Sequence, residues 1–219
     1  MGNVLSYCRR RTVKETLFEI STVLNQGVLM SAEKNILYFK DAGEVNSEKT
    51  LEAAKERADE LGIRDIVVAS TRGNVGLRAV EVFKGYNVVV VSHVTGMREP
   101  NSNELPDAMA EKIRAQGGKL VTAAHAFSGV NRAIHAKFAT MYPAGIMAQT
   151  LRLFGEGMKV VVEITAMAAD AGAISTSKDI IAIAGSGRGA DTAVVLKAAN
   201  SHSIFDVVVR EIIAKPSFG

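Results

Sequence analysis

The sequence predicts an α/β fold in which a parallel or mostly parallel sheet is covered by helices on both faces. The run "DIVVA" (65–69) shows no alternation of apolar and polar residues, as expected for a strand whose two faces are both buried. Similar runs recur along the chain, and segments with the helical spacing of apolar residues separate them. Strands that alternate with helices in this way are typical of a sheet that lies between helical layers.

The composition is that of an ordinary folded protein, with 47% hydrophobic and 22% charged residues among 219. The net charge is only +3 and the basic residues are mostly interleaved with acidic ones, so we expect no nucleic-acid partner. A single cysteine, Cys8, excludes an internal disulfide framework and a cysteine zinc site. No apolar run reaches the roughly 18 residues of a membrane-spanning helix, and the start lacks the apolar region of a secretion signal. We therefore expect a cytoplasmic protein.

Residues 1–35 are predicted to form an N-terminal extension, and residues 36–219 a single α/β domain. In the extension, the spacing of apolar side chains predicts an amphipathic helix over residues 12–26. The start "MGNVLS" also matches the pattern for N-myristoylation of Gly2, and a cysteine and three arginines follow it as further membrane-binding signals. The alternative is a start in an organism that has no such transferase. Membrane contact is therefore expected only if Gly2 is acylated.

The elements of the domain follow from the same patterns. Strands are predicted over residues 36–39, 65–69, 87–93, 119–123, 179–184 and 205–213. Helices are predicted over residues 47–61, 74–84, 106–116, 125–138, 143–155, 159–171 and 191–199. Gly62 marks the end of the first of these helices, and Pro106 suits the first turn of the third. The segment 159–171 contains consecutive valines, but its apolar residues share one helical face, so we interpret it as a buried helix.

Two of the strands are followed by glycine-bearing turns with similar sequences, which we call the first turn (residues 70–74) and the second turn (residues 185–191). "DIVVASTRGNVGLRAV" begins at Asp65 and "DIIAIAGSGRGADTAV" at Asp179, and duplication and convergence both explain the likeness. A turn that leaves a parallel strand and opens a helix presents backbone N–H groups at the positive end of the helix dipole, which favours phosphate. Side chains that can add hydrogen bonds to a phosphate are Ser70, Thr71, Arg72, Ser186, Arg188 and Thr192.

The segment "DIVVASTRGNVGLRAVEVFKGYNVVVVSH" resembles the C-terminal α/β domain of pyruvate kinase. Three further segments, "GEVNSEKTLEAAKERADELGIRDIVVAST", "VVEITAMAADAGAI" and "AGSGRGADTA", resemble more closely the stand-alone, mainly archaeal proteins built from that domain. The resemblance covers residues 36–214 and implies a three-layer α/β/α sandwich of about five core strands in the order 3-2-1-4-5, with the last strand antiparallel. It includes nothing of the catalytic barrel, so we expect no pyruvate kinase activity.

On this fold, strands 65–69 and 179–184 are neighbours at the point where the chain order reverses, which is where open α/β sheets bind ligands. The two turns are then expected to flank one crevice, in which two helix N-termini hold a single anion. The resemblance implies that residues 70–74 grip a phosphate, as the matching loop of pyruvate kinase does. Val75 stands where that loop has a further hydroxyl, which argues against the same sugar-bisphosphate effector. For the stand-alone relatives, the resemblance implies flavin mononucleotide (FMN) instead.

Further candidates stand at the same predicted edge of the sheet. His93 ends one strand and His125 follows another, so both are expected near the ligand, with binding to loop backbone as the alternative. Phe127 is a candidate to stack on a planar ring and equally a candidate core residue. Glu163 and Asp170 lie on one face of the helix 159–171, where paired carboxylates are compatible with metal or acid–base chemistry. We expect them instead to bind the amides of neighbouring loops, and no metal site is predicted. The full predicted ligand-binding set is Asn46, Ser47, Ser70, Thr71, Arg72, Gly73, Asn74, His93, His125, Phe127, Ser128, Gly185, Ser186, Gly187, Arg188, Gly189, Asp191 and Thr192.

Three functions follow from these patterns. The first is a binding protein of sensing, carrier or regulatory type that holds a small phosphorylated ligand, with FMN as the first candidate. The second is a small flavin- or phosphosugar-dependent enzyme that uses His93, His125 or Asp191, although the sequence alone identifies no set of nucleophile, base and orienting group. The third is an acylated, membrane-tethered interaction protein. A homo-oligomer is compatible with all three.

Overall fold

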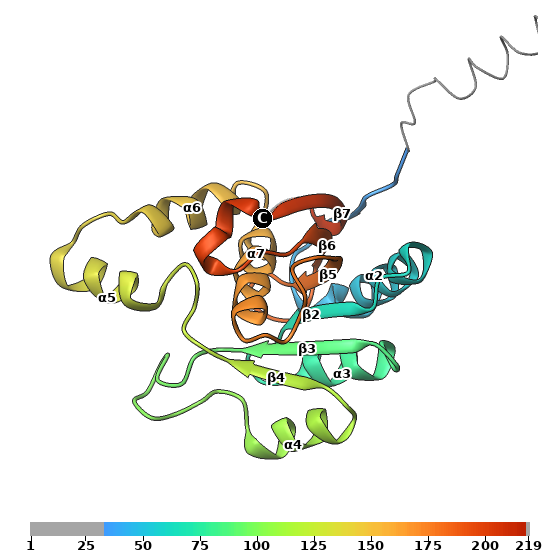
Figure 1. Cartoon of the computed structure of the whole chain (residues 1–219), viewed down its shortest axis with the longest axis horizontal. Helices are drawn as coiled ribbons and strands as arrows, with labels where there is room; N and C mark the ends of the chain where they lie inside the picture. The colour runs from blue at the N-terminus through green and yellow to red at the C-terminus, as the bar shows by residue number, and fades with distance from the viewer. Residues whose placement is uncertain (1–32, 218–219) are drawn as a thin grey trace, which may run out of the picture. The chain divides into compact units, whose positions relative to one another are not determined.

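A seven-stranded mixed sheet forms the centre of the structure, a computed structural model that describes residues 33–217 (Figure 1). Its strands are β1 (Leu37–Phe39), β2 (Asp65–Ala69), β3 (Asn87–Ser92), β4 (Lys119–Thr122), β5 (Asp179–Ala184), β6 (Thr192–Lys197) and β7 (Val208–Pro216). Their order across the sheet is β1-β7-β6-β5-β2-β3-β4, and all of them belong to one unit, Ile36–Gly219. The helix predicted over residues 12–26 and the acylation pattern at Gly2 lie outside the described residues.

The helices fall on segments that the sequence predicts as helical. They are α2 (Ser47–Leu61), α3 (Asn74–Val82), α4 (Asp107–Ala115), α5 (Gly129–Phe138), α6 (Pro143–Arg152) and α7 (Glu156–Asp170). Two short 3-10 helices, η1 (Glu44–Asn46) and η2 (Ser201–Asp206), lie outside the predicted helices. Twelve of the residues of α7 are buried, which confirms that its valine-rich sequence forms a buried helix rather than a strand. Gly62 ends α2 in the left-handed conformation that a glycine adopts without strain.

Helices cover both faces of the sheet (Figure 1). Alternate residues of a strand point to opposite faces, so each strand contributes to both layers of the core. In β2, Ile66 and Val68 pack with α2, α3 and α4, whereas Val67 packs with α6 and α7. All three side chains are fully buried. The predicted three-layer α/β/α sandwich is therefore confirmed.

The centre of the sheet has the predicted strand order. Strands β5, β2, β3 and β4 are parallel neighbours, which confirms the order 3-2-1-4 for the first four core strands. The fifth place, next to β5, is taken by β6, which runs antiparallel to β5. The strand predicted for that place, residues 205–213, corresponds to β7, which lies one place further out and pairs with β6. Beyond β6, β7 pairs antiparallel with β6, and β1 pairs parallel with β7. The sheet thus has seven strands, against the six segments that the sequence predicts as strands, and β6 is the additional one.

The helix predicted over residues 191–199 is wrong, because this segment forms strand β6. Thr192–Leu196 are all buried, and the strand is hydrogen-bonded between β5 and β7, which leaves it no solvent-facing side. Thr192, Val194 and Val195 are β-branched and suit a strand that is buried on both faces. The second turn is therefore the loop of a β-hairpin, and it does not open a helix.

Helices α5 and α6 follow β4 on one side of the molecule (Figure 1). The predicted break between two helices is confirmed, because α6 begins at Pro143, the position that the fixed backbone of proline favours. Ala148 of α6 packs against the core, whereas no residue of α5 is buried. Among residues 33–217, the structure has no helix of sufficient length and apolar character to cross a membrane.

Candidate functional site

The two glycine-bearing turns lie next to each other at the edge of the sheet where β2 and β5 end, which we call the carboxyl edge. β2 and β5 are parallel neighbours in the register Val68 to Ile183, so the next positions bring Ser70 beside Gly185. Neighbouring strands in a sheet are about 4.8 Å apart. The first and second turns therefore leave the sheet at adjacent points, as the sequence predicts.

The first turn leads into α3 and contains backbone amide groups that donate no hydrogen bond within residues 33–217. Ser70 anchors it, because its N–H donates to the Val91 carbonyl at 2.9 Å and its hydroxyl accepts from Gly76 N–H at 3.0 Å. Within the described chain, the backbone N–H groups of residues 71–75 donate no hydrogen bond. Free amides at the start of a helix carry partial positive charge and bind anions.

Gly73 is required at the end of the first turn for two reasons. Its φ of 91° lies in the left-handed region, which favours glycine. A Cβ at this position would also overlap the side chains of Met109 and Leu105, which pack against the turn from the segment around the start of α4. The neighbouring Arg72 and Asn74 are exposed, and Arg72 forms no ion pair within residues 33–217.

The second turn is held by Asp191, whose side chain is fully buried. One carboxylate oxygen accepts from Gly43 N–H at 2.7 Å and from Ser186 N–H at 3.0 Å, and the other accepts from the Thr192 hydroxyl at 2.8 Å. The sequence predicts Asp191 and Thr192 as ligand contacts, but here they bind each other and the loop. Their observed hydrogen bonds stabilise the conformation of the second turn.

Segment Gly43–Ser47 packs directly on the second turn. The Ser47 hydroxyl accepts from Ala190 N–H at 3.0 Å and donates to the Glu44 carbonyl at 2.8 Å. Gly189, with φ 74°, leaves no room for a Cβ beside Glu44. Asn46 is buried and its amide nitrogen donates to the Asp41 carbonyl at 2.7 Å. Asn46 and Ser47, which the sequence predicts as ligand contacts, thus lie beside the second turn and have structural partners there.

These contacts correct the predicted pair of helix N-termini. Each turn was expected to open its own helix, but only the first does, at α3. The N-terminus that approaches the second turn is that of α2, which begins at Ser47. Each turn therefore still lies at the positive N-terminus of a helix, α3 for the first turn and α2 for the second. Helix α2 precedes the first turn in the chain.

Parts of the second turn remain without a partner. The Ser186 hydroxyl oxygen is buried and makes no hydrogen bond with any residue from 33 to 217. The amides of Gly185, Gly187 and Gly189 also donate none within the described residues. Arg188 is exposed and forms no ion pair in residues 33–217. The loop therefore keeps hydrogen-bond donors that its own fold does not use.

Thr71, His93 and Glu104 form a hydrogen-bonded chain beside the first turn. The Thr71 hydroxyl lies 3.2 Å from His93 Nε2, and His93 Nδ1 lies 2.7 Å from Glu104 Oε2. Arg98 donates to the other oxygen of Glu104 at 3.1 Å. The hydrogen bond with His93, supported by that with Arg98, holds the pKa of the Glu104 carboxyl below its usual range. The sequence does not single out Glu104, because it stands in a polar loop with no periodic pattern.

His125 lies behind His93, with 5.3 Å between the two ring centroids. Its Nε2 accepts from Val94 N–H at 3.3 Å, which is the backbone contact expected as the alternative to ligand binding. Its Nδ1 lies 3.8 Å from the Glu163 carboxylate. Burial lowers the pKa of His125, and Glu163 opposes that shift.

The two acidic residues of α7 bind loop amides, as the sequence predicts. Glu163 accepts from Phe127 N–H at 3.0 Å and pairs with Lys159 one turn away. Asp170 accepts from Ser201 N–H at 3.0 Å and from the Asn200 side chain at 3.1 Å. In residues 33–217, no group of three or more His, Cys, Asp and Glu side chains is arranged to hold a metal ion.

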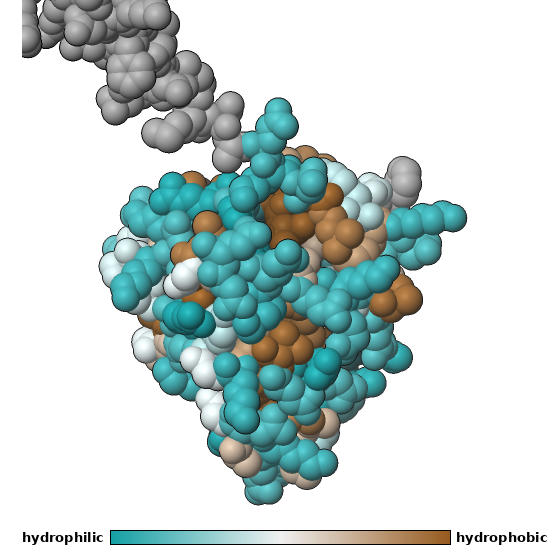
Figure 2. Space-filling model, turned by 90° about the vertical axis from the view of Figure 1, so that its right-hand side faces the viewer, coloured by the Kyte–Doolittle hydropathy of each residue, from teal (hydrophilic) through white to brown (hydrophobic). Residues whose placement is uncertain are grey.

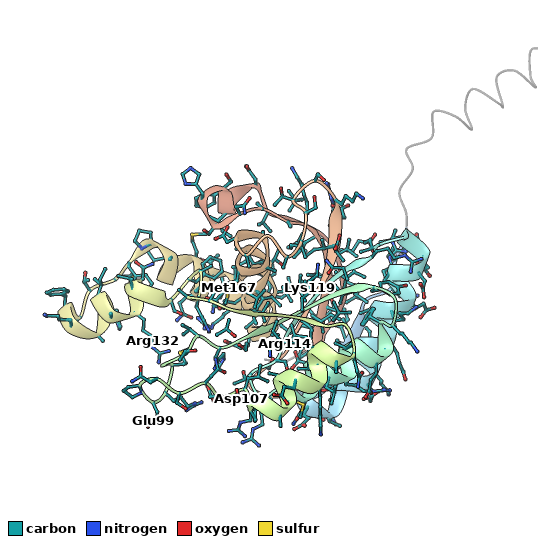
Figure 3. All side chains as sticks on the ribbon, turned by 60° about the horizontal axis from the view of Figure 1, so that its bottom comes forward. Glu99, Asp107, Arg114, Lys119, Arg132 and Met167 are labelled. Carbon is teal, nitrogen blue, oxygen red and sulfur yellow. The ribbon has the colours of Figure 1, made fainter. Side chains whose placement is uncertain are left out.

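Phe127 and Ser128 occupy the loop before α5. The Phe127 side chain is only 3% exposed and belongs to the core on the α6–α7 face, so it acts as a core residue. Ser128 precedes α5 but makes no side-chain capping bond. Further along α5, Arg132 reaches the Met97 sulfur, and Figure 3 shows Arg132 on the same side of the molecule as Glu99 of the loop after β3.

A surface cavity lies at the opposite edge of the sheet, where β2 and β5 begin. It has a volume of about 320 Å³, and its lining residues are Leu61, Gly62, Ile63, Arg64, Asp65, Lys178 and Asp179. Figure 2 shows this side of the molecule, which is mostly hydrophilic with separate hydrophobic areas. None of the predicted site residues lines this cavity, so it is distinct from the carboxyl edge.

Comparison with known proteins identifies the domain. Residues 48–196 match the family described as "Pyruvate kinase, alpha/beta domain". A crystal structure of a pyruvate kinase from Cryptosporidium parvum is 14% identical over 83% of this chain and 26% of its own, with a TM-score of 0.37. The Cryptosporidium parvum enzyme in complex with ADP is 15% identical over 87% and 27%, with a TM-score of 0.35. The chain thus spans about a quarter of the length of the pyruvate kinases it matches. Because the family match covers more than half of the sequence, the chain belongs to the pyruvate kinase alpha/beta domain family.

Proposed function

We propose that this domain binds a small phosphorylated molecule at the carboxyl edge, between the first and second turns. The observation that carries the proposal is the run of free amides over residues 71–75 at the N-terminus of α3. A phosphate placed there accepts several N–H hydrogen bonds and lies at the positive end of the helix dipole. These donors have no competing partner within the described chain.

The charges and hydroxyls around the turns support the same ligand class. Arg72 and Arg188 are both exposed, one in each turn, and a guanidinium forms paired hydrogen bonds with phosphate oxygens. The buried Ser186 hydroxyl has no hydrogen-bond partner in the part of the chain that the structure describes. A buried polar group left unpaired destabilises a protein by about 1–3 kcal/mol, so a ligand that supplies a partner recovers that energy.

FMN is the first candidate ligand, because the sequence resembles the stand-alone proteins of this family, for which that resemblance implies FMN. Val75 stands in place of a hydroxyl that a sugar-bisphosphate effector would use. The buried ring of Phe127 is not accessible for stacking on an isoalloxazine. The imidazole of His93, which is 33% exposed and next to the first turn, is a more accessible planar surface. Binding of the phosphate and of the planar ring is sufficient for a protein of sensing or carrier type, which needs no catalytic group.

The test is a fluorescence titration of the purified protein with FMN and with riboflavin, which differs from FMN only in lacking the phosphate. We expect FMN to bind at least about tenfold more tightly than riboflavin, because charge-assisted hydrogen bonds contribute about 1.5–3 kcal/mol each. Arg72→Ala should weaken FMN binding about tenfold. Arg114→Ala removes an exposed arginine from the end of α4 and should leave FMN binding unchanged. Equal affinity for FMN and riboflavin would contradict the proposal.

A further inference from the structure

The chain Thr71–His93–Glu104 has the order of groups by which proteins activate a hydroxyl. A hydroxyl, an imidazole and a carboxylate follow one another at 3.2 Å and 2.7 Å. In this arrangement the imidazole accepts the hydroxyl proton and the carboxylate fixes the imidazole. The three groups come from the first turn, the end of β3 and the loop before α4, so only the fold brings them together.

Glu104 determines which nitrogen of His93 carries the proton. Its side chain is 17% exposed and receives hydrogen bonds from both His93 and Arg98, so the carboxylate is held in place as an acceptor. A carboxylate facing Nδ1 requires a proton on Nδ1. Neutral His93 then presents the lone pair of Nε2 to Thr71, whose hydroxyl donates to it. This is the tautomer that a general base needs.

The first turn would hold a phosphoryl group next to the Thr71 hydroxyl, which is hydrogen-bonded to His93. Thr71 is the first residue of the run of free amides, so a phosphoryl group bound to the amides of residues 72–75 lies next to the Thr71 hydroxyl. Amides that bind the phosphoryl oxygens also stabilise the charge that these oxygens carry during transfer. Arg72 in the same turn adds a cation that can stabilise the negative charge of the phosphoryl group during transfer.

We propose that Thr71 is the nucleophile of a phosphate monoester hydrolase site, with His93 as general base and Glu104 as positioning residue. This proposal rests on the proposed phosphate-binding function of the same site. It also supplies the set of nucleophile, base and orienting group that the sequence alone does not identify.

The reaction consists of two displacements at phosphorus. Thr71 Oγ attacks the phosphorus, its proton passes to His93 Nε2, the ester P–O bond breaks, and the leaving alkoxide takes the proton from His93. Water then attacks the phosphothreonine and gives a proton to His93, the Oγ–P bond breaks, and Thr71 Oγ takes that proton back. The net reaction converts a phosphate monoester and water into an alcohol and inorganic phosphate, with no other reactant.

The experiment measures phosphate release from p-nitrophenyl phosphate and from FMN, together with FMN binding, for the full chain and its variants. Thr71→Val keeps the shape of the side chain without the nucleophile, so it should abolish turnover and retain FMN binding within about threefold. Thr71→Ser should retain turnover, because the hydroxyl remains. Glu104→Gln should lower kcat by at least about a hundredfold with little change in KM, as expected for loss of the correct tautomer. Thr140→Val, at an exposed threonine after α5, should change neither quantity.

A second readout detects the covalent intermediate directly. Mass spectrometry of rapidly quenched wild-type protein should find one added phosphoryl group on Thr71, and none on Thr71→Val. If FMN binds but the wild type releases no more phosphate than Thr71→Val, the hydrolase proposal fails and the binding function stands. If neither FMN nor inorganic phosphate binds, the proposed binding function itself fails.

Discussion

The buried carboxylate of Asp191 accepts a hydrogen bond from Gly43 N–H at 2.7 Å, across 148 residues of chain. This contact joins the hairpin loop between β5 and β6 to the segment that leads into α2. Because the same oxygen also holds Ser186 N–H, one side chain fixes both the conformation of the second turn and its position beside α2. The carboxyl edge is therefore built by contacts that are distant in sequence.

Asp191→Ala should destabilise the fold strongly. The substitution leaves three donors unpaired, namely the buried Gly43 N–H and Thr192 hydroxyl and the half-buried Ser186 N–H. Each such loss is worth about 1–3 kcal/mol, so we expect the free energy of unfolding in urea to fall by about 3 kcal/mol or more. Asp206→Ala, at an exposed position of η2, should change it by less than about 0.5 kcal/mol. Equal effects of the two substitutions would refute this role of Asp191.

Gly73→Ala should destabilise the protein more than Gly85→Ala. Both glycines are in the left-handed region, with φ of 91° and 87°, so both alanines carry a backbone strain of about 1–2 kcal/mol. Only the Cβ at residue 73 meets neighbouring atoms, those of Met109 and Leu105, whereas the position at Gly85 opens into free space. The difference between the two unfolding free energies isolates this overlap. Adding Met109→Ala should recover part of the loss for Gly73→Ala and none for Gly85→Ala.

His125 should make the folded state sensitive to mild acid. Burial lowers the pKa of His125 in the folded protein, whereas the unfolded chain takes up the proton at the ordinary value of about 6.5. The unfolded state therefore binds more protons, and stability is lost as the pH falls below about 6.5, by up to about 1.4 kcal/mol per pH unit. His125→Gln should flatten the dependence of unfolding free energy on pH in this range. His135→Gln, at an exposed position of α5, serves as the control, and an equal flattening by it would contradict the assignment.

The buried pair of Lys159 and Glu163 should show strong coupling. Both side chains are at most 9% exposed, and they lie one turn apart on α7. Lys159→Met leaves the Glu163 carboxylate without its cation, which should lower the unfolding free energy by about 3–5 kcal/mol. Adding Glu163→Gln removes the uncompensated charge and keeps an acceptor for Phe127 N–H, so the double variant should be more stable than Lys159→Met alone. Strictly additive losses in urea unfolding would show that the pair is not coupled.

Much of the fold follows from the sequence because burial on one or two faces leaves a periodic pattern. The parallel strand β2 and the helix α2 have the predicted ends, Asp65–Ala69 and Ser47–Leu61. The prediction of a helix at segment 192–197 is wrong. It arises because the glycine-rich second turn, which precedes this segment, resembles the first turn in sequence. Its pairing with β5 and β7 and its burial between them, which a local pattern does not reveal, decide in favour of a strand.

The candidate site was predictable mainly where residues closely follow a strand. Thr71 lies two residues after β2 and His93 directly after β3, and the structure joins them by a hydrogen bond. Glu104 completes their chain from a loop whose sequence has no regular spacing, so only the folded backbone places it. Asp191 belongs to the second turn and is predicted as a ligand contact, but the three hydrogen bonds that occupy its carboxylate depend on contacts with Gly43 and within the hairpin.

The central claim, that the free amides after β2 hold a phosphate, is tested most directly by NMR of the ¹⁵N-labelled protein during titration with FMN and with inorganic phosphate. We predict that the backbone amide signals of residues 71–75 shift with both ligands, and that those of Gly185, Gly187 and Gly189 shift with FMN. The account is contradicted if these signals stay in place, or if the shifts appear instead around the cavity at Leu61–Asp65.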